Sequence, residues 1–207
     1  MKLIVGEQAK KYVKGLPIAK DILVRKDSEI ENAIKRIGFP MVIKLISKQL
    51  AHKTDIGGVK FVHNKEDLLK NYNEIKQIAK KNNIKLDGIL FQEFVPGEWI
   101  FIGIKNDKTF GPIIMLGIGG IYVEVIKDIS FRACPINESD AESMIQELKY
   151  KKILFGARGK PLNVKLLRKI LIKASRLPFK HKFEELDINP LVLNDKNGKI
   201  VDIRVVI

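Results

Sequence analysis

The sequence predicts an α+β fold, with helices and strands mixed along the chain and arranged in two lobes. Helix-like and strand-like segments alternate in the first half, whereas strand-like runs separated by turns dominate much of the second half. The 207 residues are enough to bury one core or two smaller ones. We therefore expect an N-terminal lobe in residues 1–93 and a C-terminal lobe in residues 94–207, with a ligand between them.

In the first lobe, hydrophobic periodicity and turn residues separate the elements. Ser28 can cap the second helix and Gly38 can end it. Apolar residues recur near one face of the third helix, which makes it amphipathic. The predicted helices span residues 6–14, 28–37 and 65–81, and the predicted strands span 16–24, 40–46, 59–63 and 88–95.

The second lobe reads as an antiparallel sheet with two helices. Turn residues separate the apolar runs, and residues 194–198 are typical of a hairpin between the last two strands. The predicted strands span residues 99–104, 113–116, 122–126, 130–134, 186–193 and 199–206, and the predicted helices span 138–148 and 163–177.

Composition excludes several classes of protein. No apolar run reaches the roughly 18 residues of a membrane span, and the apolar run at the N-terminus is too short for a signal peptide. A single cysteine, Cys134, allows no internal disulfide. The expected compartment is therefore the cytoplasm.

The net charge of +14 raises the question of nucleic-acid binding. The lysines are spread along the chain, and neither an aromatic-interleaved RNA-binding pattern nor a Cys/His finger is present. We therefore expect no nucleic-acid partner and rank a basic RNA-binding protein third among the possible functions.

Two common phosphate-binding motifs do not fit. The P-loop pattern Gly-x-x-x-x-Gly-Lys-Ser/Thr is missing. Gly117, Gly119 and Gly120 suggest a dinucleotide fingerprint, but its third glycine position is Tyr122 and the strand–turn–helix order is wrong.

The segment from Ala51 to Lys60 is the most informative part of the chain. It holds His52, a lysine, an aspartate and the pair Gly57–Gly58 just after a strand-like run. Adjacent glycines can bring backbone N–H groups close to an anion. A neutral imidazole is a competent nucleophile near pH 7, so His52 can accept a phosphoryl group.

Polar residues inside apolar strands suggest where a nucleotide and its metal would bind. Lys44 lies in an otherwise apolar run, which favours an ammonium directed to a polar cleft over a lysine extending from an edge strand to solvent. Strand alternation puts Asp187 and Asn189 on one side of the strand at 186–193, and Asp202 lies on the paired final strand. Oxygen donors from two adjacent strands can hold Mg²⁺; a solvated Asp/Asn pair at a sheet edge is the simpler alternative.

Together these residues resemble one protein family. The chain is similar to the ATP-grasp β subunit of ADP-forming acetyl-CoA synthetase, or acetate–CoA ligase, which is related to the β subunit of succinyl-CoA synthetase. The resemblance runs from about residue 7 to residue 207. The segments that carry it are Lys44 and residues 52–59, 92–96, 110–112, 117–125, 127–132 and 186–191.

The resemblance implies an ATP-grasp fold and a ligase activity. The family converts acyl-CoA, ADP and phosphate reversibly to the free acid, CoA and ATP. It implies ATP or ADP with Mg²⁺ on this chain, and a partner α subunit that binds CoA and forms the acyl phosphate, with two α and two β chains. The alternative is a non-catalytic, nucleotide-binding regulatory subunit.

The resemblance also implies residue roles. His52 matches the histidine that relays the phosphoryl group, and Lys44 matches the lysine on the α- and β-phosphates. Gly57 and Gly58 match the phosphate-side loop. The remaining matches are Glu93, Phe94 and Val95 at the adenine-binding hinge, Glu98 near the ribose, and Asn189, Asp202 and Asp187 around the metal.

Two of the expected nucleotide contacts have competing interpretations. Glu98 lies one residue out of the spacing usual in the family, where Trp99 stands instead, so its contact with the ribose is in doubt. Arg132 suits a phosphate anion, but a salt bridge at a sheet edge explains an arginine at this position equally well.

Overall fold

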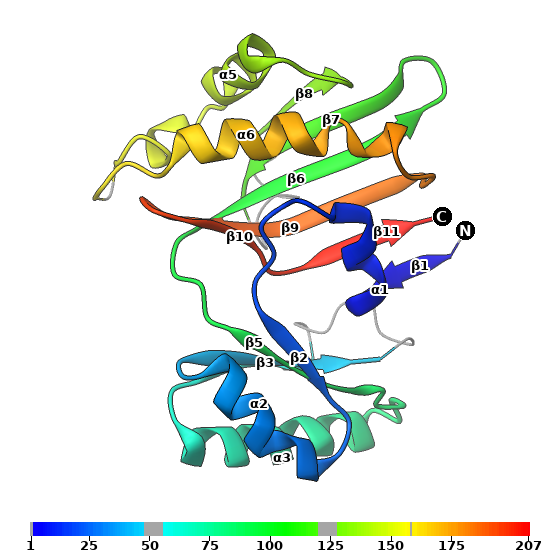
Figure 1. The fold of residues 1–207 in the computed structure, drawn as a ribbon, viewed down its shortest axis with the longest axis vertical. Helices are drawn as coiled ribbons and strands as arrows, with labels where there is room; N and C mark the ends of the chain where they lie inside the picture. The colour runs from blue at the N-terminus through cyan, green and yellow to red at the C-terminus, as the bar shows by residue number, and fades with distance from the viewer. Residues whose placement is uncertain (1, 48–55, 120–127, 158) are drawn as a thin grey trace. The chain divides into compact units, whose positions relative to one another are not determined.

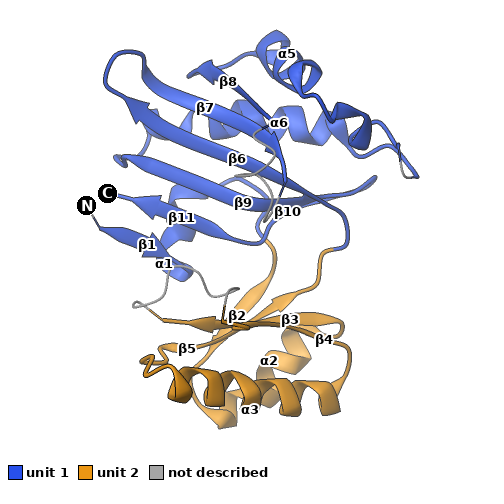
Figure 2. Cartoon of the chain, turned by 180° about the vertical axis from the view of Figure 1, so that it is seen from behind, with its two compact units in different colours: residues 1–18, 96–207 blue, residues 19–95 orange. Residues whose placement is uncertain are grey.

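The computed structural model describes residues 2–47, 56–119, 128–157 and 159–207 and divides the chain into two compact units (Figure 2). Unit 1 comprises residues 1–18 and 96–207, and unit 2 comprises residues 19–95. Helices and strands are mixed along the chain, as the α+β prediction requires. The first 18 residues, expected in the N-terminal lobe, group with the C-terminal residues because strand β1 (Leu3–Val5) pairs with β11 (Ile203–Val206).

Unit 2 is a four-stranded antiparallel sheet backed by two helices (Figure 1). Its strand order is β2-β5-β3-β4. Helix α3 packs on β3 and β4, whereas α2 packs on β2 and β5. The elements are β2 (Asp21–Val24), the 3-10 turn η2 (Asp27–Glu29), α2 (Ile30–Ile37), β3 (Met41–Ile46), β4 (Val59–Val62), α3 (Lys65–Lys81) and β5 (Gly88–Glu93).

Local sequence explains where the helices of unit 2 begin and end. The side chain of Asn64 accepts a hydrogen bond from the N–H of Asp67 at 2.9 Å and so caps α3, which has the predicted bounds. Gly38, with a φ of 76°, ends α2 as predicted. The predicted Ser28 cap is wrong: the carboxylate of Glu29 accepts the backbone N–H groups before the helix instead.

Unit 1 is built on a seven-stranded antiparallel sheet. The main path runs β1-β11-β9-β6-β7-β8, and β10 pairs with β9. Helices α5 and α6 lie over one face of the sheet (Figure 1). The further elements are α1 (Glu7–Lys10), η1 (Lys11–Val13), β6 (Glu98–Asp107), β7 (Gly111–Ile118), β8 (Ile129–Ala133), α5 (Glu138–Glu147), η3 (Lys151–Ile153), α6 (Val164–Ala174), η4 (Leu177–Phe179), β9 (Glu185–Leu193) and β10 (Gly198–Ile200).

Three predicted elements of the second lobe need comment. The strand expected at 122–126 lies outside the described residues. The helix expected at 163–177 ends at Ala174, because Pro178 cannot continue an α-helix and lies instead in η4. The strand expected at 199–206 is split into β10 and β11. No helix in the described ranges is long and apolar enough to cross a membrane.

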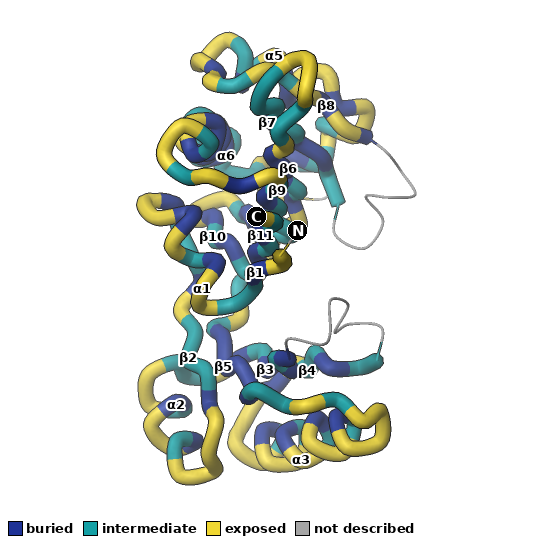
Figure 3. The backbone as a smooth tube through the Cα atoms, turned by 90° about the vertical axis from the view of Figure 1, so that its right-hand side faces the viewer, coloured by how far each residue is buried: buried dark blue, intermediate teal, exposed yellow. Residues whose placement is uncertain are grey.

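In each unit the described core residues lie on the helix-covered side of the sheet. Figure 3 marks the buried residues along the backbone. In unit 2 the alternate residues Met41, Ile43 and Leu45 of β3 are fully or almost fully buried in the core beneath the helices. Residues between them point to the opposite face, over which no described helix of unit 2 lies. The polar residues singled out in the sequence are mostly on these helix-free faces.

Candidate functional site

Lys44 lies at the centre of the helix-free face of unit 2. Its neighbours Ile43 and Leu45 point into the core, so alternation directs Lys44 to the other face. Only 6% of its surface is exposed, and its Nζ donates a hydrogen bond to Oε1 of Gln92 at 2.7 Å. A buried ammonium is costly unless it is hydrogen-bonded. Lys44 is therefore not an exposed lysine on an edge strand.

Gln92 connects Lys44 to a third residue on the same face. Its amide nitrogen Nε2 lies 3.4 Å from Oδ2 of Asp21, so Gln92 accepts from β3 and donates to β2. Only 3% of Gln92 is exposed. Its side chain was missed by the sequence analysis, although a glutamine directly after the apolar run at 88–91, within the predicted strand, was the available signal.

The end of β5 is held in place by side-chain and backbone bonds. Oε1 of Glu93 accepts the N–H of Lys20 at 2.6 Å, and the N–H of Phe94 donates to the carbonyl of Pro40 at 3.3 Å. The Phe94 ring is 40% exposed and meets the ring of Phe61 edge-on at 4.7 Å. The backbone of the predicted hinge is therefore held in place at Glu93 and Phe94. The exposed rings of Phe61 and Phe94 lie beside it.

The two residues directly before β4 are Gly57 and Gly58. Gly57 has a φ of 73°, a conformation that side chains other than glycine rarely adopt, and the carbonyl of Gly58 accepts the N–H of Leu45 at 2.7 Å. This bond ties the loop to β3 next to Lys44. His52, the predicted relay residue, lies outside the described residues.

Strand β9 carries the predicted metal ligands on the helix-free face of unit 1. Leu186 and Ile188 are fully buried in the core, which leaves Asp187 and Asn189 on the opposite side, as alternation predicts. The pairing with β6 then shifts: Ile102 faces Ile188, but Ile100 faces Leu191. This bulge inserts one extra residue into β9 beside Asn189.

Asn189 and Asp202 are brought together by the pairing of adjacent strands. The N–H of Asn189 donates to the carbonyl of Asp202 at 3.2 Å, and Oδ1 of Asp202 accepts the N–H of Ile203 at 3.2 Å. Among the described residues, the buried Oδ1 of Asn189 has no hydrogen-bond donor. An unpaired buried acceptor costs about 1–3 kcal/mol, which a cation at this position would offset. The donor set therefore fits a hard divalent metal.

Asp187 is a second carboxylate on this face. It lies opposite Arg204 of β11. Burial raises the pKa of Asp187, and the charge of Glu185 adds to the rise, whereas Arg204 and Lys105 oppose it. In the described parts of the chain no three His, Cys, Asp or Glu side chains form a metal-binding group. This fits Mg²⁺, which usually takes one or two carboxylates and completes its shell with water and phosphate oxygens.

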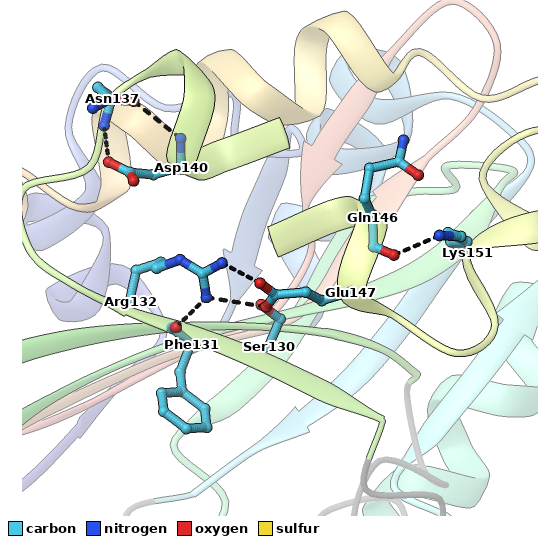
Figure 4. Close-up of polar contacts among 8 residues, drawn as sticks. All are labelled: Ser130, Phe131, Arg132, Asn137, Asp140, Gln146, Glu147 and Lys151. Carbon is cyan, nitrogen blue, oxygen red and sulfur yellow. Dashed lines mark hydrogen bonds and ion pairs between the residues drawn. The ribbon is translucent and has the colours of Figure 1, made fainter. Parts of the chain in front are cut away.

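Arg132 points towards Glu147 of α5 (Figure 4). Its guanidinium forms an ion pair with Glu147 of α5, with one contact at 3.0 Å, and Ser130 Oγ donates to the same carboxylate at 2.7 Å. The hydrogen bond between Arg132 and Glu147 raises the pKa of Arg132 and lowers that of Glu147. The contact matches the salt-bridge interpretation, and phosphate binding by Arg132 stays a prediction.

Glu98 also stands apart from the metal residues. It is exposed at the start of β6, two residues before the core residue Ile100, so alternation places it on the helix-covered side of the strand. Trp99 and Phe101 share the helix-free side with Asn189. The ribose contact of Glu98 stays a prediction.

Comparison with known proteins identifies the family. A family model described as an ATP-grasp domain matches residues 8–207. The β subunit of acetate–CoA ligase (ADP-forming) I from Pyrococcus furiosus is 37% identical and aligns with 99% of this chain and 91% of its own length. The chain belongs to the ATP-grasp family of ADP-forming acetate–CoA ligase β subunits. The family that the sequence motifs indicated is confirmed.

Relatives of this family occur both as separate subunits and as longer chains. Acetate–CoA ligase (ADP-forming) I from Archaeoglobus fulgidus is 36% identical over 93% of this chain, which spans only 29% of that protein. The present chain therefore corresponds to one segment of the longer ligases and to nearly all of the β subunit.

Solved structures confirm the ATP-grasp fold. An acetyl-coenzyme A synthetase from Ca. Korarchaeum cryptofilum, solved with coenzyme A and Ca-AMPCP, matches with a TM-score of 0.94 and 39% identity over 100% of this chain and 93% of that chain. Another structure of that enzyme contains coenzyme A and Mg-AMPPCP, with a phosphohistidine segment pointing towards the nucleotide-binding site. It matches with a TM-score of 0.86 and 38% identity over 100% of this chain and 93% of that chain.

Proposed function

We propose that this chain is the nucleotide-binding β subunit of an ADP-forming acetyl-CoA synthetase. The overall reaction converts acetyl-CoA, ADP and phosphate to acetate, CoA and ATP, and it is reversible. The observation that carries the proposal is the buried ammonium of Lys44, held on the helix-free face of a chain whose family is established. A cation held in place by a hydrogen bond is suited to binding the phosphates of a nucleotide.

The proposed nucleotide contacts on unit 2 follow from the described geometry. Lys44 would neutralise charge on the α- and β-phosphates, and the backbone N–H groups near Gly57 and Gly58 would face phosphate oxygens. The backbone at Glu93 and Val95, anchored through the bonds of Glu93 and Phe94, would bind the adenine edge, and the exposed ring of Phe94 would cover the base. Phosphoryl transfer depends mainly on such positioning and charge neutralisation.

On unit 1, Asn189 and Asp202 would hold Mg²⁺, with Asp187 as a further carboxylate. The support is the unpaired Oδ1 of Asn189 and the strand pairing that brings Asp202 beside it. When bound, Mg²⁺ neutralises phosphate charge and fixes the orientation of the phosphates. These residues would hold the cation at a defined place beside β9 and the residue that precedes β11.

His52 is proposed as the phosphoryl carrier. In the direction of ATP synthesis, an oxygen of the ADP β-phosphate would attack the phosphorus of phosphorylated His52 as the phosphorus–nitrogen bond breaks. The other ring nitrogen carries a proton, so the imidazole would leave as the neutral ring with the bonding electron pair on the freed nitrogen. The support is the position of His52 in the matched motif and the phosphohistidine segment in the Korarchaeum enzyme. A CoA-binding α subunit, in an assembly of two α and two β chains, would form the acyl phosphate that loads this histidine.

The decisive experiment combines purification with labelling. The chain is purified with its partner from the source cells, and ATP formation is assayed with ADP, phosphate and several acyl-CoA thioesters. In parallel, ³²P-ATP is offered to wild type, His52→Ala and His63→Ala; His63 is exposed and serves as the control.

We expect label on the wild type and the His63→Ala chain, and loss of both label and ATP formation in His52→Ala. Undiminished labelling of His52→Ala would refute the relay. Nucleotide binding without any ADP-dependent thioester cleavage by the purified complex would indicate a regulatory subunit instead.

A further inference from the structure

The ring of Phe101 occupies space that two glycines leave open on the helix-free face of unit 1. A methyl carbon placed on Gly103 would lie only 2.7 Å from Cζ of this ring, and one placed on Gly117 would lie 3.5 Å from Cδ1. Gly103 is two residues further along β6, and Gly117 faces Phe101 from β7. The ring therefore extends along β6 and covers Gly103, which is buried although it lies on the helix-free side of the strand.

The backbone does not require glycine at either of these two positions. Neither Gly103 nor Gly117 is among the glycines whose φ lies in the left-handed region. Both lie inside paired strands, where a glycine costs conformational entropy and offers no side chain to pack. A side chain at Gly103 would meet the Phe101 ring and also Cε of Met115, at 2.9 Å. Space for the ring is therefore a physical reason for glycine at this position.

The covered glycine places the ring beside a proposed metal ligand. Gly103 faces Asp187 directly in the pairing of β6 with β9. Residues paired in this way have Cβ positions about 4.5–5.5 Å apart, so a ring over Gly103 stands next to the Asp187 side chain. On its other side Asp187 faces Arg204 of β11, and Asp202 lies two residues before Arg204 on the same face. The ring thus restricts the β6 side and leaves the carboxylate the side towards Asp202.

We propose that Phe101 is a positioning residue for the proposed metal site, which keeps the Asp187 carboxylate turned towards a cation at Asn189 and Asp202. The inference deepens the proposed function and rests on it, because it needs a divalent metal at those residues and Asp187 as one of its ligands. An apolar ring suits this task, since it offers no strong donor that would compete with the metal for the carboxylate. Residues that orient a metal ligand from outside the coordination shell commonly change metal affinity when they are mutated.

The test measures how strongly Mn²⁺, a spectroscopic substitute for Mg²⁺, increases the affinity of the full chain for ADP. Calorimetry with and without Mn²⁺ gives this increase, and electron paramagnetic resonance in ¹⁷O-labelled water counts the water molecules on the bound ion. We expect Phe101→Ala to reduce the increase about tenfold, and to add water to the ion where Asp187 turns away. Phe131→Ala removes the same kind of ring from the same face, on β8, where it is 64% exposed, and should change neither quantity.

A double-mutant cycle shows whether Phe101 acts through Asp187. In the Asp187→Asn background, which lacks the carboxylate, Phe101→Ala should have no further effect on the Mn²⁺-dependent affinity for ADP. Additive losses would overturn the inference, as would an unchanged affinity and water count in Phe101→Ala.

Two further outcomes separate the inference from the proposed function. If Asp187→Asn leaves the metal response unchanged while Asn189→Leu abolishes it, Asp187 is not a ligand; the inference then fails and the proposed site at Asn189 stands. If Mn²⁺ does not raise the affinity of the wild type for ADP, the inference and the proposed metal site both fail.

Denaturant unfolding of the free chain tests the position of the ring without any nucleotide. Gly103→Ala should lower the unfolding midpoint of the wild type, because its new methyl group meets the ring, whereas the flexible end of Met115 can move aside. In the Phe101→Ala or Phe101→Leu background the same substitution should lower the midpoint much less, since the space is then free. An equal shift in all backgrounds would overturn the inference even if the chain bound no metal.

Discussion

The oxygen Oδ1 of Asn189 is the most informative single atom in unit 1. It is buried and, within the described residues, accepts no hydrogen bond. Because a folded chain rarely leaves such an acceptor unpaired, the atom indicates a site that a ligand completes. Local backbone geometry supports the same reading, since a strand bulge lies beside Asn189 and such bulges often redirect side chains next to functional sites.

A substitution of this residue separates binding from stability. Asn189→Leu keeps a side chain of similar size but removes the oxygen. We expect the Mg²⁺-dependent part of ADP affinity to fall about tenfold or more, because Mg²⁺ has few protein ligands. The free energy of unfolding of the metal-free chain should stay equal or rise by up to about 1 kcal/mol, since the unpaired acceptor is gone. Metal titration and chemical denaturation measure the two effects.

Asn73→Leu, on the exposed surface of α3, is the matched control and should leave the metal response unchanged. If Asn189→Leu bound Mg-ADP as tightly as wild type, Asn189 would not be a ligand, and its unpaired oxygen would need another explanation.

At the scale of elements, strand alternation could be predicted from the sequence and contacts between distant elements could not. The sides of β9 on which Asp187 and Asn189 lie follow from the apolar neighbours Leu186 and Ile188. The partner of Arg132 depends on how α5 packs against β8, and the local sequence of β8 does not indicate that this partner is Glu147. A charged residue in a strand is thus consistent with both a ligand contact and a structural ion pair until the packing is known.

The ion pair between β8 and α5 predicts a pH effect on stability. The hydrogen bond from Arg132, and then that from Ser130, lower the pKa of Glu147 below its ordinary value of 4.5. A lowered pKa in the folded state means that the interaction stabilises the fold above pH 4.5 and is lost as the pH falls below it. Glu147→Gln should therefore cost about 1 kcal/mol at pH 7, a modest amount because the pair is partly exposed, and progressively less towards pH 3.

Denaturant unfolding of both proteins between pH 7 and pH 3 measures this difference. A gap between wild type and Glu147→Gln that stays constant across this range would show that the charge of Glu147 contributes nothing to the coupling of β8 and α5.

At the scale of the whole molecule, the order of elements was predictable but the grouping of the chain ends was not. Most helices and strands appear within a few residues of their expected positions, because each depends on local periodicity and turn residues. β1 has only three residues, and its partner β11 lies about two hundred residues away in the sequence. A short strand carries too little pattern to indicate a distant partner, so residues 1–18 were expected in the first lobe.

The pairing of the chain ends also predicts which unit a mutation near the N-terminus will affect. Ile4 is 6% exposed and lies in the core of unit 1, opposite Val205, whereas its neighbour Leu3 is 47% exposed. Ile4→Ala should cost about 2 kcal/mol of unfolding free energy through the lost burial and the cavity that it leaves, and Leu3→Ala should cost much less. Hydrogen exchange followed by mass spectrometry should show faster exchange in peptides from residues 96–207 of Ile4→Ala, while peptides from residues 19–95 exchange as in wild type. Faster exchange confined to residues 19–95 would mean that the N-terminal strand stabilises the other unit, which contradicts the pairing of β1 with β11.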